Sequence, residues 1–159
     1  MQDLSEEDRA YLTRMMDLSH TLILAAHDDA TGEEAELNYD METLFEIIDK
    51  QLTIVVTRED PDGFEISLAP PDAFRLLIPT KDKLGIIAEG ITPREFYRVV
   101  LAILEAFPQQ HRLYVNYADI GYAWLRTDLP EDEAVLHMIT HDDGVRATLG
   151  LPAYDHSQW

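Results

Sequence analysis

The chain has 159 residues, of which 46% are hydrophobic, so it is long enough for one well-buried core and too short for two ordinary domains. It carries 31 acidic against 12 basic residues, a formal net charge of −19, which argues against nucleic acid and anionic membranes as partners. The absence of cysteine excludes disulfides, thiolate metal sites and cysteine nucleophiles. With no apolar run of about 18 to 20 residues and an acidic N-terminus, we expect a soluble cytoplasmic protein.

The acidity is concentrated at the N-terminal end. Residues 1–50 contain 14 acids and 3 bases. Three interpretations remain open: a surface that resists aggregation, adaptation to high internal salt, or a basic partner.

The first third of the chain shows helical periodicity. Ser5 and the acids that follow it favour a helix N-terminus, and the apolar spacing predicts a helix from Ser5 to Ala26. Thr31-Gly32-Glu33-Glu34 has the pattern of a second capping box. It predicts another helix that ends near Lys50.

From Leu52 the apolar period changes to two, which predicts strands. The predicted strands are 52–57, 64–68, 74–78 and 84–89. Asp60-Pro61-Asp62-Gly63 is a turn sequence, so the first two strands should form a hairpin and the four strands a meander.

The segment 92–107 is predicted to be the central helix. Thr92 can cap it, Pro93 suits its first position, and Glu95 can return a bond to the amide of the cap. Apolar residues cover most of its circumference, so it should be buried on more than one side.

The C-terminal third contains a second predicted hairpin and a last helix. The strands are 112–117 and 121–126, with a turn at 119–121. The helix opens after Pro130 with Val135, Leu136 and Ile139 inside, and Gly144 should interrupt it.

These elements predict a single α+β domain. It has an antiparallel sheet of five or six strands, formed by the meander and the hairpin, with a central apolar helix and flanking helices. Residues 1–30 form its N-terminal helix, 31–151 its core and 152–159 a loose tail.

The order of elements from about Met41 to Met138 resembles the CesT-type chaperones of type III secretion and the related YbjN-type domains. The resemblance rests on topology, size, acidity and the apolar central helix. It implies a non-enzymatic homodimer that pairs partly through the central helix and binds a partner's segment on exposed apolar patches. The long helix before Met41 and the fourth strand of the meander depart from that pattern.

The best chemical constellation is Glu133, His137 and His141, spaced four residues apart on a helix. Two imidazoles one turn apart can bind Zn²⁺ and a carboxylate can complete the set, although an exposed helix face with a Glu-His pair is the more ordinary interpretation. His20 and His27 are interpreted as surface residues.

The aromatic residues of the second predicted hairpin could stack on bases, but cross-strand packing is the more ordinary interpretation. They are Tyr114, Tyr117, Tyr122 and Trp124.

The excess apolar surface of the central helix predicts an interface. Either the first helix or a second subunit must cover it, and a two-fold homodimer is favoured. The predicted interface residues are Phe96, Tyr97, Val100, Leu101 and Leu104.

Three functions remain open. The leading expectation is that the protein uses no cofactor. The first is a non-enzymatic acidic protein-binding domain, for example a chaperone-like one, whose partner protein is basic or has an exposed apolar segment. The second is an acidic decoy that mimics nucleic acid towards a basic protein. The third is a metal-dependent enzyme that uses His137 and His141.

Overall fold

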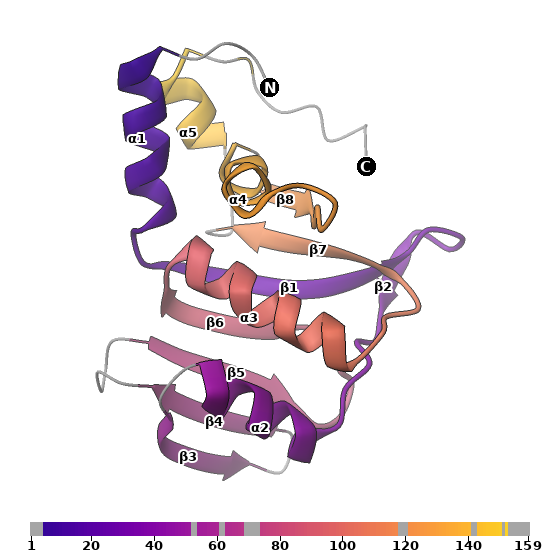
Figure 1. Cartoon of the computed structure of the whole chain (residues 1–159). Coiled ribbons are helices and arrows are strands. Elements are labelled where there is room, and N and C mark those ends of the chain that lie inside the picture. Colours follow the sequence, from indigo (N-terminus) through magenta and orange to yellow (C-terminus); the bar gives the residue numbers. More distant parts are fainter. Residues whose placement is uncertain are drawn as a thin grey trace.

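The fold is α+β, with five helices and an eight-stranded antiparallel sheet among the described residues of the computed structural model (Figure 1). The structure describes residues 5–51, 54–60, 63–68, 74–117, 121–140, 143–150 and 152. The helices are α1 (Glu6–Met16), α2 (Met41–Gln51), α3 (Pro93–Ala106), α4 (Glu131–Ile139) and α5 (Asp143–Thr148). The strands are β1 (His20–Asp28), β2 (Glu33–Ala35), β3 (Ile54–Asp60), β4 (Gly63–Leu68), β5 (Phe74–Pro79), β6 (Ile86–Ile91), β7 (Arg112–Tyr117) and β8 (Gly121–Trp124).

The strands are ordered β3-β4-β5-β6-β1-β7-β8, and β2 pairs with the end of β1. The predicted meander and both predicted hairpins are confirmed as antiparallel pairs. The predicted strand number of five or six is wrong, because β1 and β2 add to the meander and the hairpin.

The predicted helix from Ser5 to Ala26 is wrong in its second half. The helix begins as predicted, with the Ser5 hydroxyl accepting a bond from the Asp8 amide at 3.1 Å, but it ends at Met16. β1 follows and lies between β6 and β7, with Leu24 opposite both Ile86 and Val115. The described residues 5–30 therefore contribute α1 and β1 to the α+β core and do not form a separate N-terminal helix.

The predicted second helix is also too long. Thr31 and Gly32 form the turn between β1 and β2, where Gly32 has a φ of +74° and the Thr31 hydroxyl accepts from the Glu33 amide at 3.3 Å. The cap of α2 is Asp40, whose carboxylate accepts from the Thr43 amide at 2.9 Å. The capping-box pattern at 31–34 thus serves a hairpin turn.

Gly63 begins β4 beside β5. A Cβ at this position would lie 2.6 Å from the backbone oxygen of Ile78, so only glycine allows β5 to approach this closely. The two middle residues of the predicted turn, 61 and 62, lie outside the described residues.

The predicted central helix is confirmed as α3. Thr92 caps it by accepting from the Glu95 amide at 3.1 Å, and Pro93 occupies the first position. The Glu95 carboxylate accepts from the Thr92 hydroxyl, at 3.1 Å, and not from the amide of the cap as predicted.

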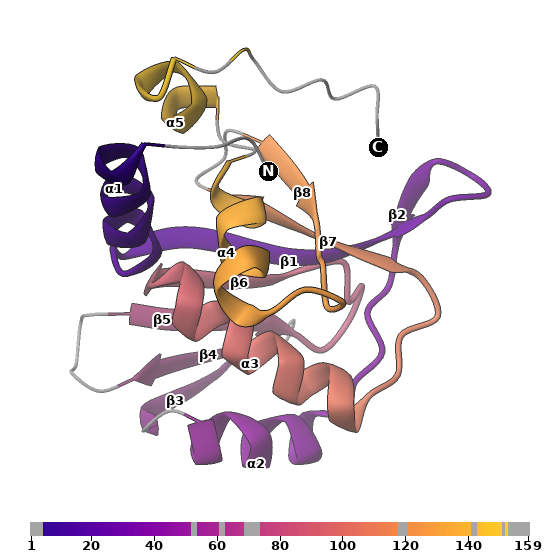
Figure 2. The ribbon, with the colours of Figure 1, turned by 45° about the horizontal axis from the view of Figure 1, so that its top comes forward.

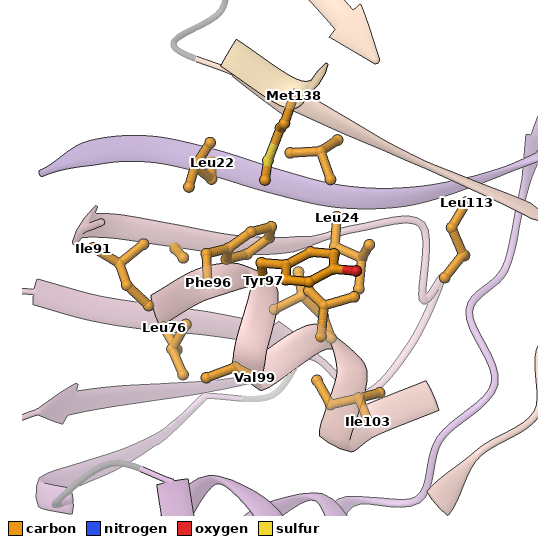
Figure 3. Close-up of a cluster of buried hydrophobic side chains, with 14 of the residues drawn as sticks. Leu22, Leu24, Leu76, Ile91, Phe96, Tyr97, Val99, Ile103, Leu113 and Met138 are labelled. Carbon is orange, nitrogen blue, oxygen red and sulfur yellow. The ribbon is translucent and has the colours of Figure 1, made fainter. Parts of the chain in front are cut away.

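Side chains of α3 pack in one core with side chains of α4 and of one side of the sheet, which we call its inner side (Figure 3). Figure 1 shows α3 in front of β6 and β1, and α2 in front of β4. In the turned view of Figure 2, α2 lies below β3 and β4. The labelled core residues are Leu22, Leu24, Leu76, Ile91, Phe96, Tyr97, Val99, Ile103, Leu113 and Met138.

The last predicted helix is divided in two. In α4, Val135 and Ile139 are buried as predicted and Leu136 is half-buried. The interruption comes before Gly144, which belongs to α5: α4 ends at Ile139, and the Thr140 hydroxyl donates to the Leu136 carbonyl at 2.9 Å. The predicted turn at 119–121 and the predicted tail lie mostly outside the described residues.

Candidate protein-binding surface

The two sides of the sheet differ in what covers them. On β1, Leu22 and Leu24 point into the core shared with the helices. Ile23 and Ala25 point to the other side, because neighbouring residues of a strand face opposite ways. In the register, Ile23 is paired with Ile87 of β6, and Ala25 with Tyr114 of β7.

We call this second side of the sheet the open face. The larger core combines residues of the inner side with residues of α1, α2, α3 and α4. The small buried cluster of the open face contains only strand residues among those described, namely Ala25, Tyr114 and Trp124. The helices α1, α2, α3 and α4 therefore pack on one side of the sheet.

An apolar row crosses the centre of the open face. Leu77 of β5 pairs with Ile87 of β6, which pairs with Ile23 of β1. All three side chains are half-buried. Each of the three residues therefore keeps part of its surface accessible.

An aromatic cluster lies beside this row. The rings of Tyr114 and Trp124 are cross-strand neighbours, 6.0 Å apart and edge to face, which confirms the predicted cross-strand packing for this pair. His27 approaches the Trp124 ring edge-on at 5.6 Å, and the Arg112 guanidinium stacks 3.8 Å from the centre of that ring. Trp124 is only 7% exposed, and its buried cluster consists of strand residues among those described.

The charges of the open face nearly balance. Arg75 lies between Glu65 and Glu89 and bonds to both, at 3.2 Å to Glu65. Across the described open face, two arginines, Arg75 and Arg112, stand against three glutamates, the third being Glu34 opposite His27. The whole chain has 31 acids against 12 bases, so the open face is far less acidic than the molecule.

The predicted interface on α3 is for the most part inside the chain. Phe96, Tyr97 and Val100 are at most 2% exposed, and Leu101 and Leu104 are half-buried against the core. The helices α1, α2 and α4 contact α3, so most of its apolar circumference is covered within the chain. Burial also raises the pKa of Tyr97, whose hydroxyl donates to the Arg126 carbonyl at 3.2 Å.

The candidate metal residues are not brought together as a described site. Glu133 is exposed and His137 half-buried on α4, and His141 lies outside the described residues. Within the described residues, no group of three histidines or carboxylates is arranged to bind a metal ion. Nearby Asp128 is engaged by Arg126 at 2.8 Å, which lowers the pKa of Asp128 to about 2.

A groove of about 680 Å³ lies between the β1–β2 hairpin and the segment before β7. Asp28, Glu33, Glu34 and Glu36 line it together with His111. The described lining includes no lysine or arginine, so the groove is acidic, and it shares Glu34 with the edge of the open face.

A shallower apolar groove of about 410 Å³ follows α1. Tyr11 and Met15 line it, and Leu18, which is 51% exposed, lies at its end.

The sequence alone could not identify the open face. Its apolar row comes from strands far apart in the chain, and β1 was predicted to be helical. The signal that existed was the outward half of each alternating strand, in which Leu77 and Ile87 are apolar where a solvated face would be polar.

Comparison with protein-family models, curated proteins and solved structures finds no match to this chain. Within the described residues, none of the helices combines the length and apolar character needed to cross a bilayer.

Proposed function

We propose that the chain is a non-enzymatic protein-binding domain that binds another polypeptide on the open face of its sheet. The observation that carries this proposal is the composition of that face. A half-buried apolar row of Leu77, Ile87 and Ile23 lies on a nearly neutral surface, in a molecule with a net charge of −19. A surface that only needs to stay dissolved would carry the acids found elsewhere on the chain.

The proposal also defines the chemistry of the partner surface. The partner surface must be apolar at its centre, because the side chains of Leu77, Ile87 and Ile23 can neither donate nor accept a hydrogen bond. It must have little net charge, because the open face has both signs in nearly equal number. The resemblance to CesT-type chaperones and YbjN-type domains supports the same class of function.

The proposal is tested by affinity capture with a matched pair of variants. The full chain is immobilised and exposed to an extract of the source cell, and retained proteins, including untagged copies of this chain, are identified by mass spectrometry. Ile87→Lys puts a charge at the centre of the open face, and Leu18→Lys puts the same charge on the exposed end of the α1 groove.

We expect wild type and Leu18→Lys to retain the same partner, and Ile87→Lys to lose it. Circular dichroism verifies that Ile87→Lys is folded. If Ile87→Lys does not fold, Leu77→Lys is used in its place. Identical retention by wild type and both open-face variants would refute the proposal.

The acidic groove favours a second candidate, a decoy for a basic protein. Its four carboxylates would attract a cationic segment at low ionic strength. Oligolysine is a suitable probe: binding that weakens steeply with salt and is reduced by Glu33→Gln supports this candidate. Salt-independent binding, or no binding, contradicts it.

A further inference from the structure

The charge of the chain restricts what can occupy the open face. Two copies with a net charge of −19 each repel one another wherever their acidic helices and hairpins meet. The repulsion is weaker where the charges nearly balance, as they do on the open face. A basic partner would be drawn instead to the acidic groove.

The open face is also complementary to itself. It carries cations and carboxylates on either side of an apolar row, with Arg75, Glu65 and Glu89 together at one side and Arg112 towards the other. About a two-fold axis, an arginine of one copy can face a glutamate of the other while the apolar rows meet. Two sheets pack in this way about 10 Å apart, with side chains interdigitated.

The area is of the right size. Six adjacent strands, β4 to β8 with β1, form the described open face. At about 4.8 Å between strands and about 3.3 Å per residue, a six-residue length gives a flat footprint of about 500 Å². Side-chain relief raises the accessible area towards the ~800 Å² per partner of a standard interface.

We infer that the occupant of the open face is a second copy of this chain, so that two sheets pack face to face in a two-fold dimer. This inference rests on the proposed function and names its partner. It also moves the expected dimer contact from α3, which its own chain covers, to the opposite side of the sheet.

The absence of cysteine allows a direct test. Ile87→Cys places a single thiol in the centre of the open face, and Leu18→Cys places one on the exposed end of the α1 groove. At a protein concentration on the order of tens of micromolar, we expect light scattering to give both cysteine variants a mass twice the chain mass of 18.2 kDa. The thiol at position 87 should react with Ellman's reagent many times more slowly at that concentration than after strong dilution.

The control thiol at position 18 should react equally fast at both concentrations. Arg75→Glu, at an exposed position that leaves the core untouched, should shift the mass towards 18.2 kDa because it removes the opposite charge. A mass of one chain at all concentrations would overturn the inference. So would a dimer in which the thiol at 18 is protected and that at 87 is not.

The two proposals can fail separately. A monomeric chain whose capture of another protein still depends on Ile87 would refute the dimer and leave the binding function standing. A monomer that captures nothing through the open face would refute both.

Discussion

Arg94 connects three helices. Its guanidinium group donates from α3 to Asp17 at the end of α1, at 3.3 Å, and to Glu131 at the start of α4, at 3.2 Å. Arg98 adds two bonds to Glu131, at 3.1 and 2.9 Å. The sequence predicted the helix that carries Arg94 and Arg98. It could not predict the partners, because only the tertiary fold brings Asp17 and Glu131 together.

The bonds to Glu131 should make part of the stability depend on pH. The hydrogen bond from Arg98, and then that from Arg94, lower the pKa of Glu131. A carboxyl with a lowered pKa contributes stability above its unfolded pKa of about 4.3 and loses it as pH falls through the folded value. Glu131→Gln should therefore cost roughly 1 kcal/mol at pH 7, allowing for solvent screening. That corresponds to a Tm lower by about 2–4 °C.

Thermal melts between pH 7 and pH 3 check this prediction. The difference in Tm between wild type and Glu131→Gln should shrink as the solution becomes more acidic. Glu133→Gln, on the same helix and exposed, is the matched control and should follow wild type. Parallel curves for both variants would contradict the role assigned to Glu131.

Among the elements, those whose ends are marked by capping or turn residues were predicted well. The sequence around α3 contains its cap and its proline, and the β3–β4 hairpin contains its proline and glycine. β1 has no such signal. As a central strand it is apolar on both sides, so Leu22, Ile23 and Leu24 form a run without alternation, which periodicity does not distinguish from a buried helix.

For the same reason, the sequence could not reveal the candidate site. The open face is defined by which side of the sheet the helices leave uncovered, and this follows only from packing. Tyr114 and Trp124 could be placed on one hairpin in advance, but their contact with His27 of β1 could not.

At the hairpin between β3 and β4, a single methyl group should be destabilising. In Gly63→Ala the new Cβ would lie 2.6 Å from the Ile78 carbonyl oxygen, so β5 must move away from β4. We expect a loss of roughly 1–3 kcal/mol, typical of overpacking, measured as a lower urea midpoint.

Gly32→Asn is the matched control. Gly32 has a positive φ, which asparagine tolerates, and no atom within 4 Å of an added Cβ. Equal midpoints for wild type and Gly63→Ala would show that β4 and β5 can separate without cost.

For the molecule as a whole, the distribution of charge predicts a dependence on salt. With 14 acids in residues 1–50, repulsion among the described hairpin and helices opposes folding at low ionic strength. As the Debye length falls from about 30 Å at 0.01 M to about 3 Å at 1 M, the Tm should rise with added NaCl.

The same series of Tm measurements with added NaCl, repeated near the isoelectric point, separates charge screening from other effects of salt. At a pH of about 4.4 the net charge is close to zero, and the dependence on NaCl should nearly vanish. A flat or falling curve at pH 7 would mean that the acids are compensated locally.

The position of β1 has a consequence for synthesis on the ribosome. β1 comes before the other described strands in the chain, and its neighbours β6 and β7 are residues 86–91 and 112–117. Until those residues leave the exit tunnel, a nascent chain exposes an apolar strand with both edges unpaired, which is a template for aggregation. Asp17 before β1 and Asp28 and Asp29 at its end place negative charge beside that strand. The acidity of the N-terminal third can thus protect the growing chain during the interval before its central strand finds its partners.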